Sequence, residues 1–135
     1  MSYRIYYFET LEVYQTANQF ARVLGAIGAS LGRRRKRKVT RLIEACIELG
    51  TSIAGGNAEM PPEEDLTREE RQAFLQRARE STAFLRAGLQ QFRKEQVGSQ
   101  PHIMAGLELL ERIDVGLADN VALIGRGFIP PCRQG

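Results

Sequence analysis

The residues of this sequence that are best placed to do chemistry form one basic run. Seven of nine consecutive positions are basic: Arg33, Arg34, Arg35, Lys36, Arg37, Lys38 and Arg41. Cations this dense favour a polyanion partner, because each can neutralise a phosphate and release the counterion bound to it. The run, named here the basic cluster, therefore predicts binding of RNA or DNA through the phosphate backbone, with little base specificity.

The rest of the chain is mildly acidic. The whole sequence has 19 basic and 16 acidic residues and a net charge of +3; without the basic cluster, 12 basic residues face 16 acidic ones, a balance of −4. The cluster lies where a helix is expected to begin, and there both the helix dipole and like charges four residues apart oppose it. Three other interpretations stay open: a solvated turn that keeps the protein soluble, pairing with the acidic segment 59–70, or a nuclear-localisation signal.

A weaker basic signal follows later in the chain. Arg79, Arg86 and Arg93 repeat every seven residues, and Arg71 precedes them. We expect these four to share one face of a helix, opposite much of its apolar stripe, where they could contact phosphates or acidic groups of a neighbouring subunit. A plain solvated face explains the row equally well.

Catalytic chemistry has little support in the sequence. The one histidine, His102, has no partner nearby in sequence, and the carboxylate pairs Glu44/Glu48 and Glu108/Glu111 lack the Glu-x-x-His pairs of a di-metal bundle. No phosphate-binding glycine loop and no nucleophile with its base is present. We predict a non-enzymatic protein with no cofactor and no bound metal; an enzyme with a metal site in the bundle core is the less favoured alternative.

The apolar residues predict an all-α fold, an up-and-down bundle of four helices. Spacings of three and four residues place the helices at 10–31, 35–54, 68–96 and 101–124. The first stripe comprises Leu11, Tyr14, Ala17, Ala21, Leu24 and Ile27. Residues 3–8 could form a strand, although one too short to build a sheet.

Turn and cap residues mark where these helices begin and end. Gly55 and Gly56 end the second helix, and Thr67 with Glu70 has the form of a capping box for the third. We expect one domain over residues 1–127 and a loose tail over 128–135. Cys46 fits a packed, reduced thiol. No segment has the length of a membrane span, and we expect no membrane partner and a cytoplasmic location.

Three motifs resemble the bacterial family of proteins encoded in intervening sequences of 23S ribosomal RNA genes. Residues 8–17 resemble the family's opening F-x-x-L-x-V-Y-Q-x-A. Residues 52–59 resemble its S-I-x-x-N-I-A-E-G signature, and residues 74–81 its F-L-x-x-A-x-x-S helix. Departures from the family pattern are Gly56, Asn57, Met60 and Phe84.

The resemblance implies a four-helix bundle that self-associates. One branch of the family, the accessory variability proteins of diversity-generating retroelements, implies more: a basic pentamer that binds nucleic acid and a reverse transcriptase. Apolar residues off the main stripes, such as Phe20, Val23, Ile47 and Phe84, add to the expectation of a homo-oligomer. A structural oligomer without nucleic-acid function is the alternative within the same family.

Overall fold

The computed structural model describes residues 5–131. Every regular element in this range is helical, so the predicted all-α class is confirmed. The elements are α1 (Tyr7–Thr10), α2 (Glu12–Ser30), the 3-10 turn η1 (Arg33–Arg35), α3 (Lys36–Gly56), the 3-10 turn η2 (Pro62–Glu64), α4 (Arg68–Glu95) and α5 (Gln100–Gly125).

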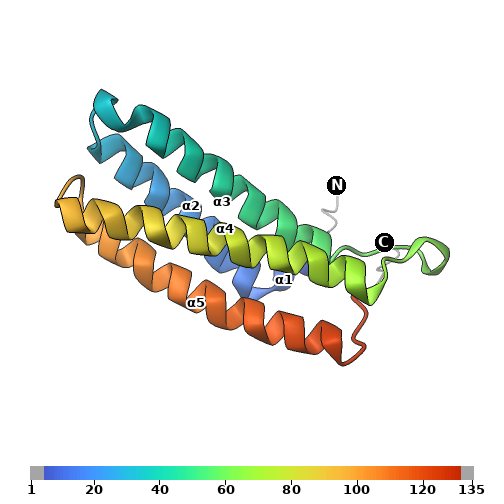
Figure 1. Ribbon diagram of the computed structural model, residues 1–135. Helices are drawn as coiled ribbons and strands as arrows, with labels where there is room; N and C mark the ends of the chain where they lie inside the picture. The colour runs from blue at the N-terminus through green and yellow to red at the C-terminus, as the bar shows by residue number, and fades with distance from the viewer. Residues whose placement is uncertain (1–4, 132–135) are drawn as a thin grey trace.

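Four long helices run up and down side by side, each packed against the helices before and after it in sequence (Figure 1). Helix α2 also packs against α5, which closes the bundle. The turn that contains η1 and the turn between α4 and α5 lie at one end of the molecule. The loop between α3 and α4 lies at the other end, together with α1 (Figure 1). The basic cluster and the acidic loop are therefore separated by the length of the bundle.

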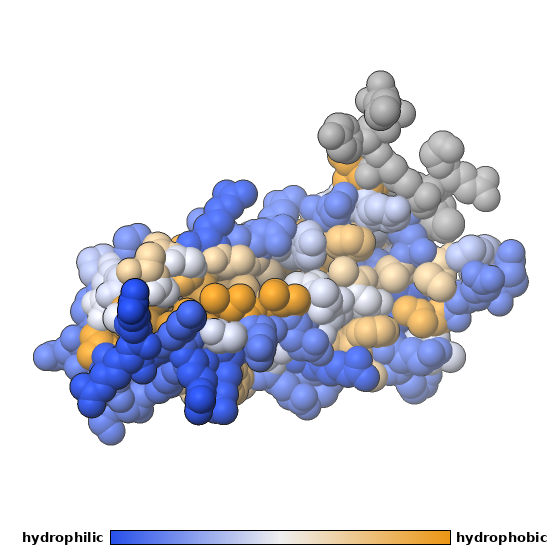
Figure 2. All heavy atoms as spheres, turned by 90° about the horizontal axis from the view of Figure 1, so that it is seen from above, coloured by the Kyte–Doolittle hydropathy of each residue, from blue (hydrophilic) through white to orange (hydrophobic). Residues whose placement is uncertain are grey.

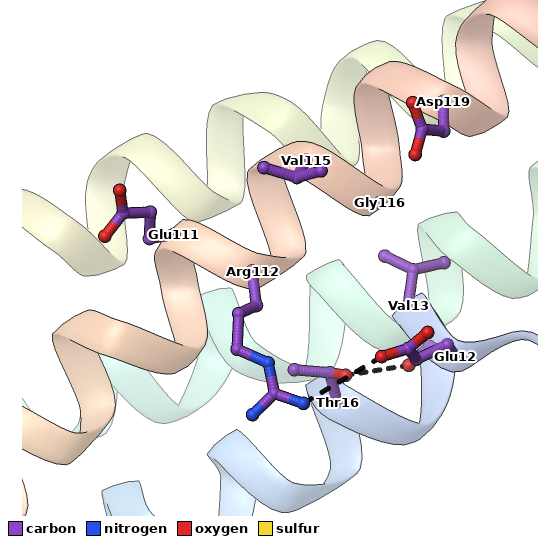
Figure 3. Close-up of a pocket in the computed structure, with 8 residues that line it drawn as sticks. All are labelled: Glu12, Val13, Thr16, Glu111, Arg112, Val115, Gly116 and Asp119. Atoms are coloured by element: carbon purple, nitrogen blue, oxygen red, sulfur yellow. Dashed lines mark hydrogen bonds and ion pairs between the residues drawn. The ribbon is translucent and has the colours of Figure 1, made fainter.

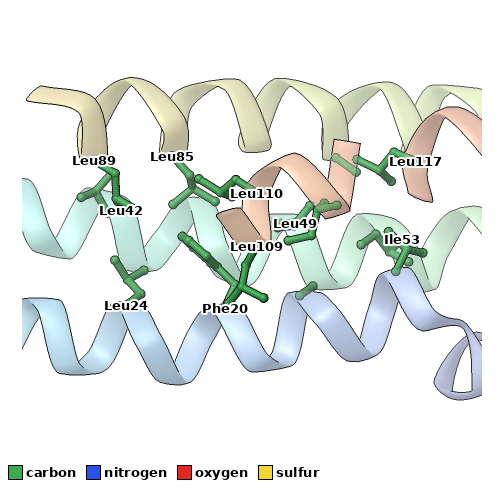
Figure 4. Packing of buried hydrophobic residues seen from close by; sticks show 14 of the residues in the cluster. Phe20, Leu24, Leu42, Leu49, Ile53, Leu85, Leu89, Leu109, Leu110 and Leu117 are labelled. Atoms are coloured by element: carbon green, nitrogen blue, oxygen red, sulfur yellow. The ribbon is translucent and has the colours of Figure 1, made fainter. Parts of the chain in front are cut away.

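The core consists of apolar side chains from all four long helices (Figure 4). Phe20 is fully buried at its centre, whereas Ala21, which the sequence placed on the buried stripe, is exposed. The rest of the predicted stripe is confirmed, because Ala17, Leu24 and Ile27 are buried and Leu11 and Tyr14 pack against the core, whereas Phe20 was wrongly assigned to the outside. Cys46 packs against this core, and burial raises the pKa of its thiol to about 11.

Helices α3 and α4 approach each other closely at three glycines. A Cβ atom on Gly55 would lie 2.6 Å from the ring of Phe74, one on Gly56 would lie 2.8 Å from Leu75, and one on Gly88 would lie 2.5 Å from Leu42. Gly55 and Gly56 are the last two residues of α3, which ends two residues beyond the predicted 54. The glycines allow close packing here, and the prediction that the helix ends at them is confirmed.

The other boundaries follow local hydrogen bonding. The Thr67 hydroxyl accepts a bond from the Glu70 amide (3.1 Å), and the Glu70 carboxylate accepts one from the Thr67 amide (2.9 Å), which confirms the capping box. At the N-terminal side, the backbone is extended at Leu11, so α1 and α2 are separate helices. Tyr7 and Phe8 of the possible strand belong to α1; residues 3 and 4 lie outside the described range.

The first residues after α5 pack back on the bundle. The rings of Phe128 and Tyr7 meet edge to face, 5.7 Å between centroids, and Pro130 is buried. Ile129, between Phe128 and Pro130, is exposed, so the loose tail over residues 128–135 stays a prediction; residues 132–135 lie outside the described range. Within residues 5–131, no helix is long and apolar enough to cross a membrane.

Candidate nucleic-acid interface

The basic cluster occupies η1 and the first two turns of α3. No side chain caps the start of either element, and the first turn of α3 contains no acidic residue. Six of the seven cationic side chains are exposed and Arg35 is half-buried. The structure therefore concentrates these charges at one end of the bundle, without the carboxylates that normally stabilise the start of a helix.

Only one member of the cluster forms an ion pair within residues 5–131. Arg35 lies 3.7 Å from the Glu95 carboxylate at the end of α4. The Lys38 ammonium lies over the Phe92 ring, 5.1 Å from its centroid, a cation–π contact. A hydrogen bond from Gln91 lowers the pKa of Glu95, with smaller contributions from the charges of Lys38 and Arg35. The remaining five cations are available for an external anion.

Four of the cationic side chains border a groove between α3 and α4, named here the basic groove. Its volume is about 580 Å³, and its lining comprises Arg34, Arg37, Lys38, Arg41, Leu42, Phe84, Ala87, Gly88 and Gln91. In the view from above, strongly hydrophilic side chains gather at one end of the molecule, next to a run of hydrophobic atoms along the same face (Figure 2). Positive charge and apolar surface thus meet at this end.

The expected arginine row on α4 is only partly correct. Arg71 is 2% exposed and does not lie on the outer face. Its guanidinium donates to Asp65 (2.5 Å) and to the carbonyls of Gly56 (3.3 Å) and Ala58 (2.9 Å). Because the Arg71 side chain is itself buried, it has no surface to offer a nucleic acid or another protein.

The other three arginines of the row lie away from the basic groove. Arg86 forms an ion pair with Asp114 of α5, whereas the groove lies on the side of α4 that faces α3. Arg79 and Arg93 are exposed. The row and the basic cluster therefore do not form one continuous surface.

A second groove, between α2 and α5, has a different chemical character (Figure 3). The acidic side chains of Glu12, Glu111 and Asp119 line it, with Arg112 reaching across to within 3.9 Å of Glu12. It narrows where a Cβ atom on Gly116 would lie 2.8 Å from Val13. Its negative charge disfavours phosphate, so the two grooves select different ligands.

The other residues considered for chemistry lie on the surface. His102 is exposed and its Nδ1 is 2.6 Å from the Ser99 hydroxyl, while both carboxylate pairs considered above are also exposed. Across the described part of the chain, no three histidine, cysteine or acidic residues lie close enough together to hold a metal ion.

Comparison with known proteins does not assign a family. No protein-family model matches the chain, and no curated protein matches it. The resemblance to the intervening-sequence proteins stays a prediction from the motifs alone.

Sequence reasoning found the cations of the basic groove but not its α4 side. Phe84, Ala87, Gly88 and Gln91 recur at spacings of three and four, so they share one flank of α4. The spacing was readable in the sequence, but three of the four residues are small or polar, so no apolar stripe marked them. The sequence indicates Phe84 as a residue for subunit contact and as a departure from the family pattern, but not as part of a groove.

Proposed function

We propose that this protein is a non-enzymatic adaptor that binds RNA or DNA through the basic cluster. The observation that carries the proposal is the set of exposed cations in η1 and α3, of which only Arg35 has a carboxylate partner in the described residues. Unpaired cations at a helix start destabilise the folded protein slightly and gain most when phosphate approaches. The proposal also explains why the charges are concentrated at one end of an otherwise acidic chain.

The test is the salt dependence of binding. Contacts to about four to six phosphates give a slope of roughly −3 to −5 in a plot of log affinity against log salt concentration. We expect a variant with glutamine at Arg34, Arg35, Arg37 and Lys38 to show a much flatter slope with an unchanged circular dichroism spectrum. Fluorescence anisotropy of labelled RNA and of labelled DNA measures the affinity at each salt concentration.

A matched control removes the same charge elsewhere. Glutamine at four exposed arginines outside the cluster and outside the arginine row of α4 changes the net charge equally: Arg22, Arg68, Arg112 and Arg126. The control should keep a slope close to that of the wild type. Equal loss in both variants would assign binding to the overall charge and contradict a role for the cluster.

Self-association is a second part of the proposal. Ile43 and Ile47 on α3 are 43% and 61% exposed, and burying such side chains between copies of the chain stabilises an oligomer. Together with the resemblance, this favours a closed homo-oligomer, with five subunits as the preferred number. Light scattering during gel filtration measures it, and a monomer at micromolar concentration contradicts it.

A reverse transcriptase is the proposed protein partner. Repeating the basic cluster around a ring would add many weak phosphate contacts through effective concentration, so that template RNA and its polymerase are held together. This part of the proposal depends on the motif resemblance. Arg71, considered earlier for protein contact, is buried and takes no part, which leaves Arg79 and Arg93 as the free cations of that row.

A further inference from the structure

We infer that the basic groove binds unpaired nucleotides and that Phe84 stacks on a base there. The inference rests on the proposed function and names the form of nucleic acid that the cluster takes. It depends on four features: the size of the groove, its exposed aromatic ring, the line of its cations and the negative charge beyond Phe84.

Small residues keep the α4 side of the groove low. Ala87 has only a methyl group, and the space directly over Gly88 is filled by Leu42 of α3, which lies 2.5 Å from where a Cβ atom would be. Long cationic side chains rise on the α3 side and Phe84 on the α4 side. The volume of about 580 Å³ is in the range of sites for drug-sized molecules, which suits a few nucleotides and is far too small for a duplex.

Phe84 is the exposed ring of this groove. Its side chain is 50% exposed. Within residues 5–131 its ring contacts no other aromatic ring and no cation, whereas the rings of Phe74 and Phe92 each lie under a cation. An exposed phenylalanine gains hydrophobic free energy when another flat, apolar surface covers it. Bases provide such a surface regardless of sequence, but in a duplex their faces are already stacked.

The cations of the groove follow one line along η1 and the start of α3. Arg34 and Arg41 are seven residues apart, so the line spans about 10 Å along the helix. One strand of B-DNA rises about 3.4 Å per nucleotide along the duplex axis, and the phosphates of an unpaired, extended strand are spaced more widely, so this length matches at most about three phosphates. A strand lying along α3 places its bases toward α4 and therefore toward Phe84.

Negative charge limits the strand beyond Phe84. The next depression between the same helices is lined by three carboxylates, those of Glu44, Glu48 and Glu80, and by two arginines, Arg41 and Arg77; its net charge is −1, whereas the basic groove has four cations and no carboxylate. These carboxylates repel phosphate, so the strand leaves the surface after Phe84. Each subunit then contacts only a few nucleotides, and an aromatic residue at the boundary stacks on the last of them.

The chain lacks tryptophan, which makes a direct optical test possible. The Phe84→Trp variant contains a single indole at a half-exposed position. Stacking on a base should quench its fluorescence when a uridine or thymidine oligonucleotide of about twelve nucleotides is added. Val115→Trp is the matched control, because Val115 is 60% exposed on α5 and lines the acidic groove.

We expect strong quenching for Phe84→Trp with either oligonucleotide, weak quenching with a duplex of the same length, and none for Val115→Trp. Phe84→Ala should weaken single-strand binding about ten-fold, whereas Phe84→Tyr should keep it. Both variants should keep the salt slope of the wild type, since no cation is removed. A difference in quenching between the uridine and the thymidine oligonucleotide would show a preference for RNA or for DNA.

Several results would overturn the inference. Equal quenching by the duplex, or unchanged binding by Phe84→Ala, removes the stacked base but leaves the proposed function intact if the salt slope persists. Equal quenching by an oligoglutamate peptide assigns the groove to acidic proteins instead. Absence of any salt-dependent binding by the wild type removes the proposed function as well.

Discussion

Arginine side chains are exposed at one end of the bundle, and one arginine is buried at the other. At the η1 end, Arg34, Arg37 and Arg41 are exposed and form no ion pair within the described residues. At the other end, Arg71 is almost fully buried, and its guanidinium bonds to one carboxylate and two carbonyls. The same side chain is thus a surface charge at one end and part of the interior at the other.

The difference comes from what each end has to satisfy. The last carbonyls of a helix lack partners within the helix, and Arg71 donates to those of Gly56 and Ala58 where α3 ends. Close by, the side-chain amides of Asn57 and Asn120 donate to each other's oxygens at 2.7 and 3.0 Å, which joins the end of α3 to α5. The buried polar groups at this end bond to one another, whereas Arg34, Arg37 and Arg41 at the η1 end form no ion pair within the described residues.

The largest effect should come from removing the buried guanidinium. Arg71→Met keeps a long apolar side chain but leaves the Asp65 carboxylate and two carbonyls without their donor. Asp65 is partly exposed and regains some hydration, so we expect a loss of roughly 2–3 kcal/mol in the free energy of unfolding. Urea denaturation followed by circular dichroism measures it.

Arg79→Met is the matched control, on the same helix but at an exposed position. It should change stability by no more than about 0.5 kcal/mol. Equal losses in the two variants would mean that the buried hydrogen bonds of Arg71 contribute nothing beyond packing, and the contrast between the two ends would fail.

Sequence patterns predicted the helices well because apolar spacing is a local property. Four long helices follow directly from it, and the capping box follows from another local pattern, Thr67 three residues before Glu70. The position of Arg71 was also readable in principle: it continues the heptad positions of Leu75, Ala78 and Thr82, all of them buried. Charge was given more weight than spacing, and the prediction of an exposed arginine was wrong for that reason.

What the sequence could not show depends on contacts between distant segments. The carbonyls that accept from Arg71 are 13 and 15 residues away, and the amide partner of Asn57 is 63 residues away. The α4 side of the basic groove depends likewise on which flank of α4 faces α3. Local periodicity gives the buried stripe of each helix, but it does not identify the neighbour on each side.

A smaller effect, of opposite sign, should appear at the η1 end. Replacing Arg34 and Arg37 by glutamine removes every pair of cations four residues apart in the cluster, while Arg35 keeps Glu95 and Lys38 keeps its contact with Phe92. Each such pair costs a few tenths of a kcal/mol, so we expect stability to rise by roughly 0.5–1 kcal/mol at low salt. Urea midpoints at low and at high salt measure it.

The gain should shrink at about 1 M salt, where charges are screened within about 3 Å. The same double variant should bind nucleic acid more weakly, because two phosphate contacts are gone. Higher stability with weaker binding is the signature of residues retained for a ligand and not for folding. Lower stability would instead mean that these arginines hold the start of α3 in place, and the two ends would then differ in degree only.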